Sequence, residues 1–380
     1  MSGFGLYIHW PFCAAKCPYC DFNSHVRASI DEDGWADAIL TELAHVAALQ
    51  GADRPVVQTI FFGGGTPSLM GAQSIGRVID QAARLWRSAN DIEITLEANP
   101  ASADAGRFAD YARAGVNRLS LGVQALNDAD LKFLGRLHNV AEAKRALALA
   151  QRVFERVSLD LIYARPGQSA RAWQDELAEA LAFGTEHLSL YQLTIEPATP
   201  FATLYKTGAI SVPGEDLAAE LFELTQAMTA DAGVPAYEIS NHARAGAEAR
   251  HNLLYWRYGA YAGVGPGAHG RLDLNGTRFA TMCERLPERW RENVAREGHG
   301  ITEMTAIGDD DAAREHLLMN LRLSEGIDLV DYRARWSRAP SAERIAALAA
   351  GGFVACDRER LCATARGRLV LNRVISELLD

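Results

Sequence analysis

The chain has 380 residues, of which 48% are hydrophobic and 23% are charged, and its formal charge is -10. This composition is typical of a globular protein with room for one large domain or two smaller ones, and the acidic balance disfavours nucleic acid as a partner. Six cysteines are too few for a disulfide framework, no apolar run reaches the roughly 20 residues of a membrane span, and no signal peptide precedes the first apolar run, so we expect a cytoplasmic protein.

The first predicted element is a strand over residues 6–9, and a cysteine-rich loop follows it directly. This loop carries Cys13, Cys17 and Cys20. Three thiolates on one short loop can bind three irons of a 4Fe-4S cubane, which leaves the fourth iron open to another molecule. Structural zinc is the alternative, but it needs four protein ligands, and the next cysteine, Cys283, is far away in sequence. We therefore predict an iron–sulfur cluster on this loop.

Strand-like and helical stretches alternate from this loop to about residue 200. Helical spacing of alanine and leucine marks stretches such as residues 34–50 and 141–152. The alternation predicts an α/β fold of about six repeated βα units with parallel strands, whose active site lies at the carboxyl ends of the strands. The further predicted strands are residues 58–62, 91–97, 118–123, 157–163 and 187–193.

Polar residues follow several of these strands. A glycine turn at residues 63–67 would let a ligand approach backbone amides. Glu97 and Asp160 are carboxylates at or near the ends of apolar strands, where a charge is costly unless it meets a hydroxyl, an amine or a cation. Ligand binding and a buried ion pair with Arg118 or Arg136 both satisfy this requirement, and the sequence leaves both open.

Beyond residue 205 the strict alternation fades. A helix over residues 215–232 is followed by a glycine-rich turn region over residues 255–276 and a helix-rich stretch. We expect a barrel domain over residues 1–205, an extension over 206–300 and a C-terminal domain over 301–380. In the last domain, helices at 309–323 and 341–350 precede a hairpin at 351–364, which suggests a mostly helical, winged-helix-like domain.

His251 lies in the extension, beside aromatic residues. A neutral imidazole is an axial ligand for haem iron, and Tyr255 and Trp256 offer flat apolar surface for a macrocycle. Arg250 and Arg257 could pair with the propionates of a haem. The alternative is a hydrogen-bonded packing histidine without a ligand.

The cysteine spacing Cys13-x3-Cys17-x2-Cys20, together with the glycine turn, resembles the radical S-adenosylmethionine (SAM) superfamily. The resemblance implies a partial (β/α)6 barrel, with the amine and carboxylate of SAM chelating the open iron. In that superfamily an electron delivered to the cluster cleaves the sulfonium to a 5'-deoxyadenosyl radical.

Within the superfamily, residues 7–13, 120–124 and 160–163 resemble the oxygen-independent coproporphyrinogen III oxidase group. This resemblance implies that the three loop cysteines bind a cluster and that several residues of the barrel contact SAM. Carried over position by position, the SAM contacts are Tyr7, Tyr19, Gly64, Gly65, Thr66, Glu97, Gln124, Arg136 and Asp160.

Two details separate the chain from the decarboxylating oxidases. Phe22 stands where those enzymes carry a further cysteine, and the run from His251 to Trp256 resembles HemW-type haem chaperones. Resemblance to that family implies that the chain binds haem partly through His251 and passes it to acceptor proteins, which could include a membrane-bound haem enzyme. It is also compatible with an electron donor as a partner and with a homodimer. The alternatives are a coproporphyrinogen III oxidase, which Phe22 disfavours, and a radical SAM enzyme with a non-porphyrin substrate.

Overall fold

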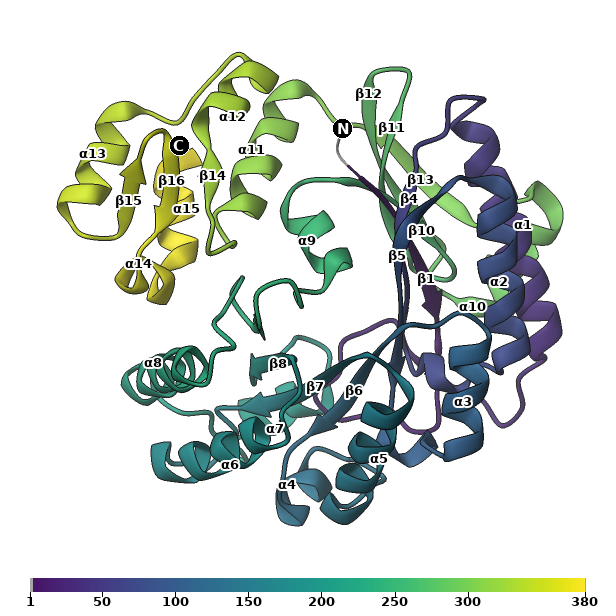
Figure 1. Ribbon diagram of the computed structural model, residues 1–380, viewed down its shortest axis with the longest axis horizontal. Helices are drawn as coiled ribbons and strands as arrows, with labels where there is room; N and C mark the ends of the chain where they lie inside the picture. Colours follow the sequence, from purple (N-terminus) through teal and green to yellow (C-terminus); the bar gives the residue numbers. More distant parts are fainter. Residues whose placement is uncertain (1–2, 380) are drawn as a thin grey trace.

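The computed structural model describes residues 3–379, so the outermost positions of the first and last predicted domains, residues 1, 2 and 380, lie outside it. An 11-stranded sheet curves through the molecule in the order β13-β12-β11-β10-β1-β4-β5-β6-β7-β8-β9 (Figure 1). Its parallel part contains all six predicted strands, which confirms the α/β class and the partial barrel. These strands are β1 (Phe4–Trp10), β4 (Val57–Gly64), β5 (Ser88–Ala98), β6 (Arg118–Gln124), β7 (Arg156–Tyr163) and β8 (His187–Gln192).

The helices between the parallel strands cover the convex face of this sheet (Figure 1). Strand β6 shows how the sequence produces the two faces, because side chains alternate along a strand. Leu119 and Leu121 are fully buried in the apolar core, whereas Ser120 bonds to Asp160 on the concave side. This side of β6 is therefore polar at Ser120. The helices between the parallel strands are α1 (Glu32–Leu49), η1 (Pro67–Leu69), α2 (Ala72–Leu85), η2 (Pro100–Ser102), α3 (Ala105–Arg113), α4 (Asp128–Phe133), α5 (Val140–Val153) and α6 (Ala170–Ala182).

Five strands that the sequence did not predict extend the sheet at its two edges. The prediction of a turn region at 255–276 and a helix-rich stretch after it is wrong for β10 to β13. Glycine there allows close packing of strands, since a Cβ on Gly263 would lie 2.0 Å from the carbonyl oxygen of His269. The five strands are β9 (Asn241–Ala243), β10 (Ala260–Val264), β11 (His269–Leu274), β12 (Thr277–Cys283) and β13 (Ile301–Ala306).

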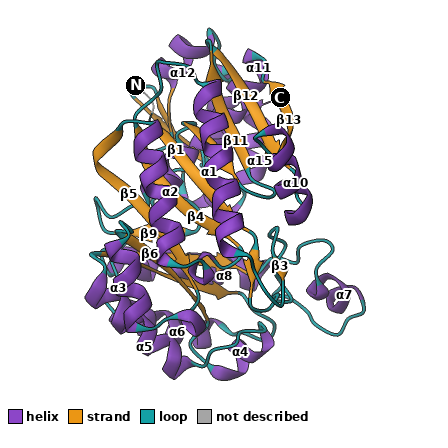
Figure 2. Cartoon of the chain, turned by 90° about the vertical axis from the view of Figure 1, so that its right-hand side faces the viewer, coloured by secondary structure: helices purple, strands orange, loops and turns teal. Residues whose placement is uncertain are grey.

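Further helices lie around the open side of the barrel. The predicted helix at 215–232 is confirmed as α8 (Glu215–Asp231). Helix α9 (Arg250–Trp256) contacts β1, β4 and β10 and lies on the concave side (Figure 1). Helix α7 (Pro200–Lys206) projects at the end where the short pair β2 (Phe12–Cys13) and β3 (His25–Val26) is found (Figure 2). Helix α10 (Pro287–Glu297) packs against α1.

The C-terminal residues form a second apolar core, which includes Leu317, Tyr332, Leu361 and Ile375. Helices surround a three-stranded sheet in the order β14-β16-β15. Among residues 3–379, no helix has the length and apolar composition to cross a membrane. The elements of this part are α11 (Asp309–Asn320), β14 (Ile327–Asp328), α12 (Leu329–Trp336), α13 (Ala342–Ala350), β15 (Val354–Asp357), β16 (Arg360–Ala363), α14 (Ala365–Leu369) and α15 (Leu371–Leu379).

Candidate functional site

The three loop cysteines lie just beyond the carboxyl end of β1, and all three are half-buried. Two hydrogen-bond donors reach their sulfur atoms: Thr66 Oγ1 donates to Cys13 Sγ at 3.3 Å, and Arg136 Nη1 donates to Cys17 Sγ at 3.4 Å. Such donors stabilise negative charge on sulfur, as an iron–sulfur cluster requires.

The chemistry of this donor set fits a cubane better than a single metal ion. Within residues 3–379, no three His, Cys, Asp or Glu side chains converge around one ion-sized point. Each cysteine of a cubane binds a different iron, so its sulfurs need not meet around one ion. Burial raises the pKa of the Cys13 and Cys20 thiols, and iron binding would therefore release protons from this loop.

The glycine turn is fastened to the cysteine loop by backbone hydrogen bonds. The amide of Gly65 donates to the carbonyl of Trp10 at 2.7 Å, and the amide of Thr66 donates to that of Phe12 at 2.8 Å. A Cβ on Gly65 would lie 2.7 Å from the carbonyl oxygen of Phe12, so no larger residue fits without a shift of backbone. The turn and the loop thus form one unit at the carboxyl end of β4.

Glu97 lies at the carboxyl end of β5, and Asp160 lies in the middle of β7. Ser120 Oγ donates to both carboxylate oxygens of Asp160, at 3.1 and 3.0 Å. Burial and the nearby charge of Asp160 raise the pKa of Glu97 to about 8, and burial also raises the pKa of Asp160. Within residues 3–379 neither carboxylate has a salt bridge to Arg118 or Arg136, so the structure lacks the ion pair that the sequence left open.

The remaining residues expected to contact SAM lie at the same end of the barrel or on the concave face. The Tyr7 hydroxyl bonds to His9 Nδ1 at 3.1 Å on β1. Gln124 ends β6 in a left-handed conformation, with φ of 76°. Arg136 Nη2 donates to the carbonyl of Gly122 at 2.9 Å, and Tyr19 lies against Phe201 of α7. Of these residues, Arg136 also contacts the cysteine loop, through its hydrogen bond to Cys17.

His251 lies beside Tyr7: its ring stacks on those of Phe61 and Tyr7, with ring centroids 5.1 and 6.4 Å apart. It is 1% exposed, its Nδ1 bonds to Thr59 Oγ1 at 2.7 Å, and its Nε2 bonds to the Tyr255 hydroxyl at 2.6 Å. Burial and the charge of Arg118 lower its pKa to about 3, so the imidazole is neutral. Because both ring nitrogens are occupied, binding of iron to Nε2 would require the Tyr255 hydroxyl to move away.

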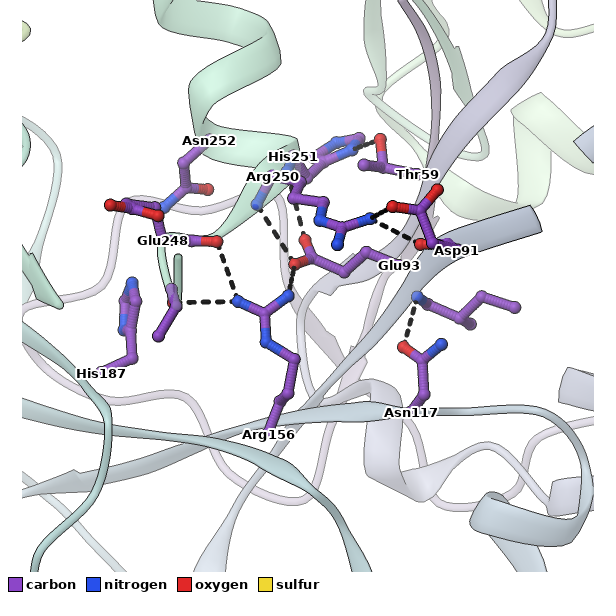
Figure 3. A network of polar contacts seen from close by, with 12 residues as sticks. Thr59, Asp91, Glu93, Asn117, Arg156, His187, Glu248, Arg250, His251 and Asn252 are labelled. Atoms are coloured by element: carbon purple, nitrogen blue, oxygen red, sulfur yellow. Dashed lines mark hydrogen bonds and ion pairs between the residues drawn. The ribbon is translucent and has the colours of Figure 1, made fainter. Parts of the chain in front are cut away.

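A polar network below His251 was missed by the sequence analysis (Figure 3). Glu93 Oε1 accepts the amide of His251, and Glu93 Oε2 pairs with Arg156 at 2.5 Å. The sequence did contain a signal for this network, namely polar residues at alternate positions of apolar strands. Examples are Arg156 and Ser158 on β7 and His187 on β8.

The two arginines that flank the histidine segment are already paired. Arg250 Nη1 bonds to Asp91 at 2.7 Å, and Arg257 Nε bonds to Glu325 at 2.8 Å. Both side chains are about half exposed, and their role toward propionates stays a prediction.

Comparisons with known proteins agree with this geometry. Residues 7–180 match the radical SAM superfamily, and residues 307–370 match the HemN C-terminal domain. The chain is 40% identical to the heme chaperone HemW of Escherichia coli, over 87% of this chain and 85% of that protein. It is 36% identical to the heme chaperone HemW of Mycobacterium tuberculosis, over 99% of this chain and 95% of that protein.

Among solved structures, coproporphyrinogen III oxidase (HemN) of Escherichia coli, described as a radical SAM enzyme, has a similar fold. The TM-score is 0.83 at 22% identity, and the match covers 99% of this chain and 90% of that one. At this identity the likeness supports the fold alone.

Proposed function

The chain belongs to the HemW-type family of the radical SAM superfamily, and on this premise we propose that it is a haem chaperone, which binds haem and passes it to acceptor proteins. The observation that carries the proposal is the similarity to HemW proteins over nearly the whole chain, including the C-terminal part. Phe22, which is 60% exposed on the cysteine loop, supports the same choice because the decarboxylating oxidases carry a further cysteine there.

We expect Cys13, Cys17 and Cys20 to hold a 4Fe-4S cluster, with SAM at the open iron. When bound, these groups supply one-electron chemistry at the carboxyl ends of the strands. Thr66 and Arg136 hold negative charge on sulfur through their hydrogen bonds. The cysteine loop thus receives hydrogen bonds at two of its sulfur atoms and is joined to the glycine turn by backbone hydrogen bonds.

The other polar residues of the concave face suit the rest of SAM. The glycine turn has no side chains that would keep the amino-acid part of SAM from its backbone, and its Gly65 and Thr66 amides are engaged by the cysteine loop. Tyr7 would lie near the sulfonium. Glu97, largely protonated near neutral pH, can donate a hydrogen bond as well as accept one. Together with Asp160 it offers partners for the hydroxyl and amine groups of the ligand.

A radical decarboxylase acting on coproporphyrinogen III is the second candidate. The observation that favours it is the fold shared with HemN over 99% of the chain. Both candidates need the cluster and SAM, so the distinction lies in whether the porphyrin is carried or converted.

Haem binding to the cluster-reconstituted protein tests the proposal. Under anaerobic conditions we expect absorbance to saturate near a single haem per chain. His251→Ala should weaken binding or change the absorption spectrum, because it removes the proposed axial ligand. Tyr255→Phe should bind haem at least as tightly as the wild type, since it frees Nε2 of His251.

Tyr255→Phe is the matched control for this experiment. It removes one hydroxyl from the same buried hydrogen bond but leaves the imidazole in place. No saturation in the wild type would refute the haem chaperone, and equal curves for wild type and His251→Ala would exclude His251 as the ligand.

A further inference from the structure

Arg165 is a buried arginine in the loop that follows the carboxyl end of β7. Ala164, just before it, has a left-handed backbone conformation with φ of 56°, which is unfavourable for a residue with a Cβ. In this turn, Arg165 Nη1 donates back to the carbonyl of Ile162 on β7 at 2.5 Å. Because Arg165 is only 1% exposed, the loop holds a cation inside the protein.

Two carboxylates from two different helices share this guanidinium. Arg165 Nε donates to Asp130 Oδ2 on α4 at 3.0 Å, and Arg165 Nη2 donates to Glu176 Oε2 on α6 at 2.5 Å. Gln168 Nε2 also donates to Glu176 Oε2, at 3.1 Å. The donors of a guanidinium have fixed directions, so an arginine that bridges two carboxylates restricts where both can lie. The ion triad of Arg165, Asp130 and Glu176 thus ties the loop after β7 to α4 and α6.

Helix α4 ends shortly before Arg136, one of the residues expected to contact SAM. The amide of Arg136 donates to the carbonyl of Leu131 at 2.9 Å, so the place of Arg136 depends on the last turn of α4. From there its guanidinium donates to Cys17 Sγ at 3.4 Å and to the carbonyl of Gly122 at 2.9 Å. Its buried Nε has no hydrogen-bond partner within residues 3–379. One N–H of Arg136 is therefore left for a ligand beside the cysteine loop.

Glu176 holds the beginning of the same segment. Its Oε1 accepts the amide of Leu126 at 2.7 Å. Leu126 comes two residues after Gln124, which is also expected to contact SAM and ends β6 in a left-handed conformation. The ion triad therefore fixes residues 124–136 at two points, one near each of the two expected SAM contacts.

We propose that Arg165 is a positioning residue for the SAM site, which acts through Asp130 and Glu176 on the places of Arg136 and Gln124. The inference rests on the proposed binding of SAM and adds to it a residue that is not itself expected to contact SAM. A displacement of about 1 Å in a group that contacts a ligand is enough to weaken its interaction severely. A purely stabilising role for Arg165 is the alternative, and it predicts normal SAM binding in every variant that folds.

The test measures the affinity for SAM and the reduction potential of the cluster on reconstituted protein. We expect Arg165→Met to weaken SAM binding about tenfold or more, the loss associated with a hydrogen bond to a charged group. The potential should become more negative, because the hydrogen bond from Arg136 to Cys17 is weakened, while iron and sulfide content stays at the wild-type level. Arg171→Met is the matched control and should change neither quantity, since Arg171 pairs with Asp175 on the exposed surface of α6.

A double variant separates positioning from stability and serves if Arg165→Met does not fold. Arg165→Met with Glu176→Gln leaves no unpaired carboxylate at position 176 and keeps an acceptor for the amide of Leu126. We expect it to recover unfolding free energy relative to Arg165→Met but to bind SAM weakly, because α4 still lacks its tie to the loop after β7. Wild-type SAM affinity in the double variant would overturn the positioning role.

A second comparison asks whether Arg165 acts through Arg136. In an Arg136→Gln background, Arg165→Met should weaken SAM binding by a clearly smaller factor than in the wild type. The same factor in both backgrounds, or equal SAM affinity and potential in wild type and Arg165→Met, would overturn the inference while the SAM site stands. A wild type that holds the cluster but binds no SAM would overturn both.

Discussion

Cys17→Ala is expected to abolish the iron–sulfur cluster. After anaerobic reconstitution, the variant should hold iron and sulfide only at background level and lack the visible charge-transfer absorbance of the wild type. The physical reason is that one iron of the cubane loses its only protein ligand, and the next cysteine in the chain, Cys283, is buried against Glu42. SAM binding should fall in parallel, because the open iron that chelates it is lost.

Cys356→Ala provides the control. Cys356 is an exposed free thiol in the C-terminal hairpin, so its replacement should leave iron content and absorbance unchanged. Full iron and sulfide content in Cys17→Ala would contradict the assignment of the cluster to this loop, and loss of iron in both variants would indicate a general effect of cysteine removal.

Glu42→Ala is expected to cause the largest loss of stability. Glu42 lies on α1 with 0% exposure and accepts the amides of Gly265 at 2.7 Å and Gly300 at 2.6 Å, as well as the indole N–H of Trp290 at 3.1 Å. Its removal would leave three buried donors without an acceptor. We expect the free energy of unfolding to fall by about 3 kcal/mol or more in urea denaturation.

Glu288→Ala is the matched surface control. Glu288 pairs with Arg27 at 2.7 Å, and both side chains are more than one-third exposed. Exposed pairs of this kind contribute little, so the control should lose less than about 1 kcal/mol of unfolding free energy. Equal losses for the two variants would show that the buried carboxylate is not the link between α1 and the later strands.

The sequence predicted the parallel half of the sheet because its strands are apolar runs separated by helical spacing. It failed between β10 and β13, where glycine indicates a turn by composition but permits close strand packing in the fold, as Gly263 shows. The acceptor role of Glu42 could not be predicted either. Its partners, Gly265 and Gly300, are more than 200 residues away in sequence.

In the candidate site, too, local patterns could be predicted from the sequence and contacts between distant segments could not. The cysteine loop and the glycine turn are local patterns, and the structure brings them into contact through Gly65 and Thr66. The surroundings of His251 are partly nonlocal: its hydrogen bond to Thr59 and the stacking of its ring on Phe61 and Tyr7 depend on tertiary packing. Residue types alone therefore singled out the histidine but not the hydrogen bonds that hold it.

Product analysis tests most directly whether this chain carries porphyrin or converts it. The cluster-reconstituted protein would be incubated anaerobically with SAM, a reductant and coproporphyrinogen III, and the porphyrins then separated and quantified. Haem chaperone function predicts that coproporphyrinogen III is recovered unchanged from a preparation that saturates with haem in parallel. Formation of protoporphyrinogen over several turnovers would contradict it and identify the chain as a radical decarboxylase.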